Sequence, residues 1–306
     1  RYRRGDIDKV RGTGVDWGLV SIPVSEIQLQ GERGLSADEG LNKLLGAAEY
    51  ALSLGMTVSV GMEDSSRADM GFLVRLVNSL HREGIRRFRY ADTVSAHHPG
   101  QIAGRVSTLL GEVPGDVELE VHCHNDFGLA VANTLSGIAA GAAWASTTIA
   151  GIGERTGNAP MEEVALAWRY LYGGHSAIRA GLLKRAADIV IAASGRSVGD
   201  AKPIVGKLAF THESGIHVDG LMKDRETYQT FDPLEVGREH QFVLGKHSGK
   251  GGIVHVLNKL GLQADSETTD RLLVRVREYA ELSKNNVPES LLLEWLMEEQ
   301  AAKDAV

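Results

Sequence analysis

The chain has 306 residues, enough for one large domain or for one domain with appendages. Hydrophobic residues make up 43% and charged residues 24%, which excludes a chain that is disordered by composition. A formal net charge of −7 without a basic block argues against nucleic acid and membranes as partners, and a single cysteine excludes an internal disulfide. Because no apolar run approaches the roughly 20 residues of a membrane span, and the polar start is not typical of a signal peptide, we expect a cytoplasmic enzyme.

The first 170 residues alternate between short apolar strands and amphipathic helices. A helix after the first strand is predicted to begin at Ser36, because Glu39 three residues on completes a capping box. Such a succession of β–α units predicts parallel strands joined by right-handed crossovers. The strands are predicted over residues 15–22, 57–60, 86–91, 117–122 and 145–149.

Two architectures accommodate these five units, an open doubly wound sheet and a (β/α)8 barrel. A doubly wound nucleotide-binding sheet carries a glycine-rich phosphate loop, and the nearest candidate here, residues 151–153, lacks the closing glycine. We therefore predict an α/β fold of the TIM-barrel type. Since a complete barrel has eight units, it is expected to lack its first two or three β/α units.

After residue 174 the alternation stops, and helical stretches are separated by polar segments. Two of these segments read FTHESGIH at residues 210–217 and KHSGK at residues 246–250. We predict a partial catalytic barrel over residues 1–175. Linker helices and a lid subdomain over residues 176–245 and a helical C-terminal subdomain over residues 246–306 are predicted to follow.

The strongest chemical signal is VELEVHCHND at residues 117–126. Side chains alternate faces along a strand, so His122 and His124 share one face with Glu120, whereas Cys123 faces the other side as a small buried residue. Two imidazoles at the carboxyl end of a parallel strand can bind one divalent cation. The alternative is an ordinary hydrogen-bonded polar strand end. Glu120, one step deeper, is placed to orient a ligand or the substrate.

A second signal follows the last clear strand, where residues 151–160 read GIGERTGNAP. Its glycines allow a tight loop over the mouth of a barrel. The amide of Asn158 can supply an oxygen ligand to a metal ion, or the residue can cap the helix that Pro160 opens.

These two motifs, at this separation, resemble those of the acyl-CoA Claisen-condensing barrel enzymes, which are the homocitrate, 2-isopropylmalate and citramalate synthases. Further matches stand in order along the chain, and the resemblance covers roughly residues 5–300. The segment SVGMEDSSR at residues 59–67 is most similar to homocitrate synthases of the nitrogen-fixation type. The other matching segments are residues 23–26, 91–94, 210–217 and 245–249.

The resemblance implies metal-assisted condensation of acetyl-CoA with a 2-oxo acid, most readily 2-oxoglutarate, followed by thioester hydrolysis to homocitrate and CoA. It implies a homodimer in which the lid of one subunit reaches the barrel of the other. The implied ligands of a Mg, Mn or Zn ion are His122, His124 and Asn158, and the implied catalytic residues are His217, Glu63 and Tyr228. The implied substrate-binding residues are Thr93, Ser59, Gly61, Glu120 and Arg155.

Several of these residues have simpler interpretations. Thr93 can cap a turn with its hydroxyl, Arg155 can pair with Glu154 or another carboxylate, and Tyr228 can be a packed aromatic ring.

Other residues have a functional interpretation from their position. Ser59 and Gly61 are small residues on one strand face, which leaves room for a longer 2-oxo acid. Glu63 is placed to pair with His217 and raise its basicity.

One departure from the family concerns its first strand, which ends in an Arg-Asp-Gly-Glu-type motif that supplies an acidic metal ligand. No such motif occurs in this sequence, whose start aligns just ahead of the family's fourth strand. Three neutral ligands alone predict weak divalent-ion affinity.

The alternatives to homocitrate synthesis are isopropylmalate or citramalate synthesis and a truncated, non-catalytic subunit. A lyase of the 3-hydroxy-3-methylglutaryl-CoA type is disfavoured, because residues 151–158 lack its catalytic cysteine.

Overall fold

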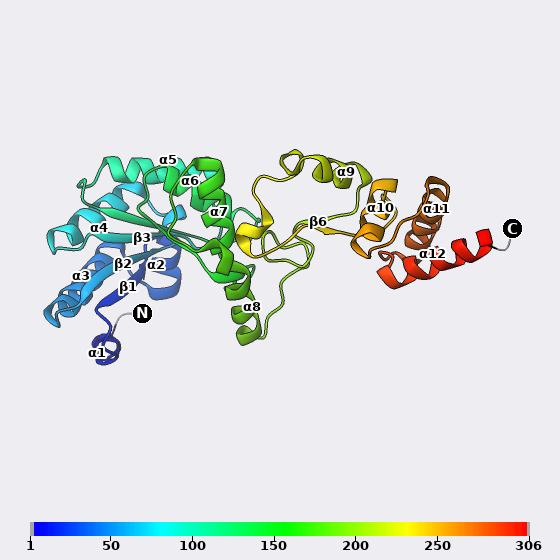
Figure 1. Ribbon diagram of the computed structural model, residues 1–306. Helices are drawn as coiled ribbons and strands as arrows, with labels where there is room; N and C mark the ends of the chain where they lie inside the picture. Colours follow the sequence, from blue (N-terminus) through cyan, green and yellow to red (C-terminus); the bar gives the residue numbers. More distant parts are fainter. Residues whose placement is uncertain (1–2, 305–306) are drawn as a thin grey trace. The chain divides into compact units, whose positions relative to one another are not determined.

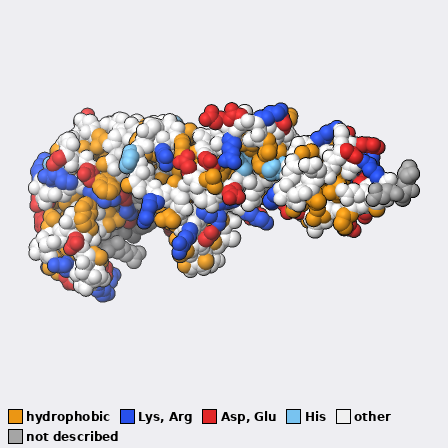
Figure 2. Space-filling view, in the orientation of Figure 1, with side chains coloured by type: hydrophobic (Ala, Val, Ile, Leu, Met, Phe, Trp, Pro, Cys, Tyr) orange, Lys and Arg blue, Asp and Glu red, His pale blue; other side chains and the backbone are white. Residues whose placement is uncertain are grey.

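The structure is a computed structural model, and it describes residues 3–304. The chain divides into two compact units, with the boundary between Ser176 and Ala177 (Figure 1). Each unit is described by itself. Within the described residues, no helix is both long and apolar enough to cross a membrane. On the face shown in Figure 2, acidic and basic side chains are interspersed.

The first unit is built on a parallel sheet whose strand order follows the chain, β1-β2-β3-β4-β5. Five consecutive β/α units of a TIM-type barrel are thus present in the described part of the chain, which confirms the predicted fold class. The strands are β1 (Trp17–Pro23), β2 (Thr57–Glu63), β3 (Arg87–Asp92), β4 (Glu118–Cys123) and β5 (Trp144–Ser146). The helices are α1 (Arg4–Gly12), α2 (Glu26–Arg33), α3 (Ala37–Ser53), α4 (Met70–Arg82), α5 (Pro99–Gly111), α6 (Ala130–Ala139) and α7 (Met161–Tyr172). The short 3-10 turns are η1 (Ser65–Arg67) and η2 (Ile149–Gly151).

Two local expectations need correction. An additional helix, α2, precedes the predicted one, because Ser25 caps it by accepting a hydrogen bond from the backbone N–H of Gln28. The last strand, predicted over residues 145–149, ends at Ser146. The chain bends there into η2, in which Ala150 has a left-handed φ of 56°. The capping box predicted at Ser36 is confirmed at the start of α3.

The core of the first unit lies between the sheet and its helices. Alternate β4 residues Leu119, Val121 and Cys123 are at most 1% exposed. The apolar faces of α4 and α5 join the same buried cluster, including Leu76 and Val106. Burial of this apolar surface, worth about 25 cal/mol per Å², holds the strands in register, so that their carboxyl ends share one edge of the sheet.

The second unit is mainly helical and has a core of its own around α10, α11 and α12, including Leu272 and Trp295. Its two short strands, β6 (Thr211–His212) and β7 (Gln241–Phe242), pair in parallel. The predicted division of this unit near residue 245 stays a prediction. Its helices are α8 (Leu183–Ser194), α9 (Gly215–Lys223), α10 (Lys250–Lys259), α11 (Ser266–Ser283) and α12 (Glu289–Asp304). Its 3-10 turns are η3 (Ala180–Leu182), η4 (Arg225–Thr227) and η5 (Pro233–Val236).

Candidate active site

The end of β4 carries the two histidines on the side opposite the apolar core. Cys123, between them, is 1% exposed, and burial raises the pKa of its thiol to about 12. The prediction that Cys123 is a small buried side chain is therefore confirmed. The neighbouring imidazoles are left facing the same side of the sheet.

The two imidazoles lie close together. Their ring centroids are 5.0 Å apart, with the ring planes nearly perpendicular at 87°. His122 Nδ1 is 3.0 Å from Ser146 Oγ on β5, whereas the buried Nδ1 of His124 has no hydrogen-bond partner among the described residues. Burial lowers the pKa of His122 to about 4 and also lowers the pKa of His124. Both rings are therefore neutral at pH 7, the form in which imidazole binds a metal.

The loop after β5 brings Asn158 to the same place. The backbones of His124 and Asn158 form an antiparallel bridge, and the N–H of Asn125 donates to the carbonyl of Gly157 at 3.0 Å. Gly157 has a φ of +90°, and a Cβ there would lie only 2.0 Å from the carbonyl oxygen of Gly151. The loop closure therefore needs glycine at position 157.

The Asn158 amide is held on one side only. Its Nδ2 donates to the carbonyl of Ile152 at 3.1 Å, while its buried Oδ1 has no partner within the described part of the chain. The interpretation of Asn158 as a helix cap is wrong, since the cap residue of α7 is Pro160.

The Oδ1 of Asn158 and the Nδ1 of His124 have no hydrogen-bond partner among the described residues, and a metal ion would supply one by coordination. These residues therefore fit a divalent cation. Across residues 3–304, however, no group of three or more His, Cys, Asp or Glu side chains is arranged to hold a metal. The part of the chain that the structure describes thus offers two imidazoles and an amide oxygen at this site, without a carboxylate to offset the cation's charge.

Arg155, on the loop after β5, contacts the loops that follow β3 and β4. Its Nε and Nη2 donate to the two carboxylate oxygens of Asp126 at 2.9 and 3.0 Å, and Nη2 also donates to the carbonyl of Thr93 at 2.7 Å. This pairing holds the pKa of Asp126 well below its usual range, helped by the Ser95 hydroxyl at 2.7 Å. The contact with Glu154 is longer, at 3.5 Å. Arg155 is thus engaged with the protein on the loops after β3 and β4.

The predicted substrate residues on β2 and just after β3, and the predicted catalytic residue Glu63, have structural partners as well. The hydroxyl of Thr93 accepts a hydrogen bond from the backbone N–H of Asp64 at 2.8 Å, as a turn-capping residue does. Glu63 accepts a hydrogen bond from the Ser21 hydroxyl at 2.9 Å. Ser59 is buried, and its hydroxyl is 3.5 Å from a β1 carbonyl. A Cβ on Gly61 would lie 2.6 Å from Ser21 Oγ, so packing against β1 accounts for the absence of a side chain there.

Glu120 is buried on β4, two residues before His122 and on the same face. Its carboxylate pairs with two arginines of β3. Its two oxygens accept from Arg87 Nε at 2.9 Å and from Arg89 Nε at 2.6 Å. The carboxylate therefore pairs with two cations on the neighbouring strand.

In the second unit, the structure brings His217 and Tyr228 together. Their rings stack with centroids 4.2 Å apart and an interplanar angle of 29°. His217 lies on α9, and Tyr228 follows η4. Glu63 belongs to the first unit, so its pairing with His217 stays a prediction.

Two protein-family models match successive parts of the chain. A family described as HMGL-like matches residues 1–190, and a homocitrate synthase post-HMGL domain-like family matches residues 204–284. The chain belongs to the HMGL-like family. Among relatives of this HMGL-like chain, 2-isopropylmalate synthase 2 of Caldanaerobacter subterraneus is 39% identical over 90% of this chain and 71% of its own length. Homocitrate synthase 1 of a Nostoc species is 38% identical over 96% of this chain and 78% of its own length.

Solved structures support the fold of the HMGL-like chain. The crystal structure of hydroxymethylglutaryl-CoA lyase from Pseudomonas aeruginosa matches with a TM-score of 0.56 at 22% identity, over 62% of this chain and 67% of that one. This likeness concerns the barrel architecture alone.

Sequence reasoning missed three residues that shape this HMGL-like site. Asp126 holds Arg155, Ser146 contacts His122, and the buried Glu162 accepts a hydrogen bond from the backbone N–H of Ala150 at 3.1 Å. Asp126 lies two residues after His124, a position at a strand end that could have drawn attention. The pattern offered no comparable signal for Glu162, because its burial results from the fold of the loop.

Proposed function

We propose that this protein condenses acetyl-CoA with a 2-oxo acid and hydrolyses the thioester, with 2-oxoglutarate as the acid and homocitrate and CoA as products. The observation that carries the proposal is the pair of buried, unpartnered atoms, His124 Nδ1 and Asn158 Oδ1, beside His122 at the carboxyl edge of the sheet. In TIM-type barrels, this edge is where active sites are built. The names of the relatives, synthases of both the isopropylmalate and homocitrate types, support the reaction class.

His122, His124 and Asn158 would hold the divalent cation. When bound, that ion supplies a Lewis acid for the keto carbonyl of the 2-oxo acid. The protein must also remove a proton from the acetyl methyl group, and we assign this step to His217, stacked on Tyr228. The methyl carbon then forms the new bond to the keto carbon, whose C=O double bond opens so that its oxygen takes up a proton. Water then breaks the thioester C–S bond and leaves a carboxylate and free CoA. In the homodimer that we propose, the lid of one subunit reaches the barrel of the other and brings His217 to Glu63.

The choice of 2-oxoglutarate rests on the resemblance of residues 59–67 to homocitrate synthases. The small size of Gly61 no longer supports it, because Ser21 already requires glycine there. 2-Oxoisovalerate and pyruvate, the acids of isopropylmalate and citramalate synthesis, are therefore the alternatives to test. A non-catalytic subunit is the alternative of a different class, favoured by the lack, among the described residues, of an acidic ligand to join His122, His124 and Asn158.

The test is release of free CoA from acetyl-CoA by the purified full-length protein, with each of the three acids in turn. We expect release with 2-oxoglutarate, loss of it with a chelator, and recovery on adding Mg²⁺, Mn²⁺ or Zn²⁺. His124→Ala should abolish turnover, whereas the matched variant of an exposed histidine, His175→Ala, should retain it. Release with only 2-oxoisovalerate or pyruvate would overturn the substrate, and no release with any acid would favour the non-catalytic subunit.

A further inference from the structure

A chain of hydrogen-bonded side chains lies beside the His217–Tyr228 pair. His212 Nε2 is 3.1 Å from His240 Nδ1, and His240 Nε2 is 2.9 Å from Gln229 Oε1. The ring of His212 is also 6.3 Å from the ring of His217, with the planes at 70°. We call His212, His240 and Gln229 the imidazole bridge.

The direction of each hydrogen bond in the imidazole bridge follows from its last member. The Gln229 oxygen can only accept, so His240 donates through Nε2–H. A neutral His240 then has an unprotonated Nδ1, which accepts the N–H of His212. In this arrangement His240 must be neutral, because its Nδ1 accepts while its Nε2–H donates, and His212 needs only a proton on Nε2. Burial lowers the pKa of His212 and of His240, with a further contribution to His212 from His240 and to His240 from Arg225, which supports this state.

The two ends of the bridge meet the two members of the stacked pair. Gln229 directly follows Tyr228 in the chain, and His212 packs near His217. The backbone supports the same arrangement, since the N–H of Gln241 donates to the carbonyl of Phe210 at 3.0 Å and that of Val243 to the carbonyl of His212 at 3.0 Å. Tyr228 itself is 39% exposed and follows a turn of only three residues, so local structure alone restrains it weakly.

We propose that His212, His240 and Gln229 are positioning residues that hold Tyr228 in its stack on His217. The role rests on the proposed function only for its effect on turnover, because the stacking itself can be measured without activity. His240 must bridge the loop that carries Gln229 and the strand that carries His212. Loss of that bridge frees Tyr228 to move away from the imidazole.

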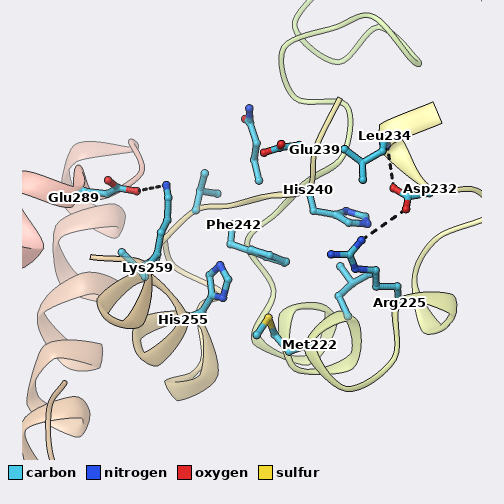
Figure 3. A pocket seen from close by; sticks show the side chains of 14 residues that line it. Met222, Arg225, Asp232, Leu234, Glu239, His240, Phe242, His255, Lys259 and Glu289 are labelled. Carbon is cyan, nitrogen blue, oxygen red and sulfur yellow. Dashed lines mark hydrogen bonds and ion pairs between the residues drawn. The ribbon is translucent and has the colours of Figure 1, made fainter. Parts of the chain in front are cut away.

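A matched control is present in the same part of the unit. A cavity of about 830 Å³ has both His240 and His255 in its wall (Figure 3). Figure 3 shows Phe242 between them, with its ring centroid 6.3 Å from that of His240 and 4.5 Å from that of His255. Within residues 3–304, His255 contacts the aromatic ring but does not take part in the bridge. His255 therefore controls for the loss of an imidazole packed on Phe242 without loss of the bridge.

The experiment compares His240→Phe with His255→Phe in the full chain, after thermal unfolding shows that each is folded. The first readout is the NMR chemical shift of the His217 ring protons, which the Tyr228 ring current displaces. Tyr228→Leu defines the shift without a stack. We expect His240→Phe to move the His217 signals toward the Tyr228→Leu values, and His255→Phe to leave them in place. Long-range nitrogen correlations should show the Nε2–H tautomer for both His212 and His240 in the wild type.

The second readout is turnover. We expect kcat to fall about tenfold in His240→Phe, which loses both hydrogen bonds of the bridge, with little change in His255→Phe. Gln229→Met should repeat both results if His240→Phe fails to fold. An unmoved His217 shift in His240→Phe or Gln229→Met, or an equal shift in His255→Phe, would overturn the inference. If the wild type releases no CoA, the proposed function fails, while the shifts still decide whether the bridge holds Tyr228.

Discussion

Replacement of Gly220 by alanine tests whether Tyr228 is held where the structure places it. Gly220 lies within α9, and an added Cβ would be 2.5 Å from Cε2 and 2.8 Å from Cδ2 of the Tyr228 ring. Ordinary carbon–carbon contacts are about 3.5–4.0 Å, so the ring must retreat by about 1 Å. Because Tyr228 is 39% exposed, it can move toward solvent and leave its 4.2 Å stack on His217.

The free energy of unfolding should change little in Gly220→Ala. Alanine in place of glycine inside a helix stabilises by about 1 kcal/mol, and loss of an aromatic stack costs about 0.5–1.5 kcal/mol. Turnover should fall much further, because a displacement of about 1 Å in catalytic geometry can reduce the rate by about 100-fold. Thermal unfolding measures the first effect and CoA release the second.

Gly251→Ala, on α10 of the same unit, is the control, since a Cβ there would meet no atom within 4 Å. It should retain full turnover. If Gly220→Ala also keeps its kcat and its His217 ring shifts, Tyr228 does not pack on Gly220 and the reasoning is refuted.

Four other predictions concern the sheet edge and the imidazole bridge. The native Cys123 thiol, 1% exposed, should not react with a thiol reagent at pH 8 until the protein unfolds; labelling of the native protein at the rate of a free thiol would contradict its burial. Glu120→Gln should lower the free energy of unfolding by about 2–3 kcal/mol in urea titrations, since it leaves two partly exposed arginines unpaired, whereas Asp38→Asn, in an exposed pair, should cost under about 1 kcal/mol. Asn158→Asp should tighten Mn²⁺ binding in calorimetry by adding the missing negative charge, and Asn158→Ala should weaken it about tenfold; equal affinities would remove this residue from the site. Because the folded-state pKa of His240 is lowered, its protonation favours the unfolded chain, so the free energy of unfolding should fall as pH drops below about 6.5, and fall less steeply in His240→Phe.

Much of the secondary structure of the first unit could be predicted from the pattern of apolar and polar residues over short stretches of sequence. The periodicity of two in residues 117–124 determines which side chains of β4 enter the core, and the period near 3.6 determines the apolar faces of α3 and α4. The pairing of His122 with His124 follows from that alternation alone. Capping at Ser36 is equally local, because both of its partners lie within one helical turn.

Only the tertiary structure decided what the remaining site residues contact. Arg155 reaches Asp126 and the Thr93 carbonyl, 29 and 62 residues away, and Gly61 is small because Ser21 of the neighbouring strand occupies the space. Such partners depend on strand register and loop closure, which the residues themselves do not encode locally. The same applies to the imidazole bridge, whose members come from residues 212, 229 and 240 and meet only after β6 and β7 pair. Periodicity in sequence therefore determines the face on which a side chain lies, whereas packing between distant segments determines its partner.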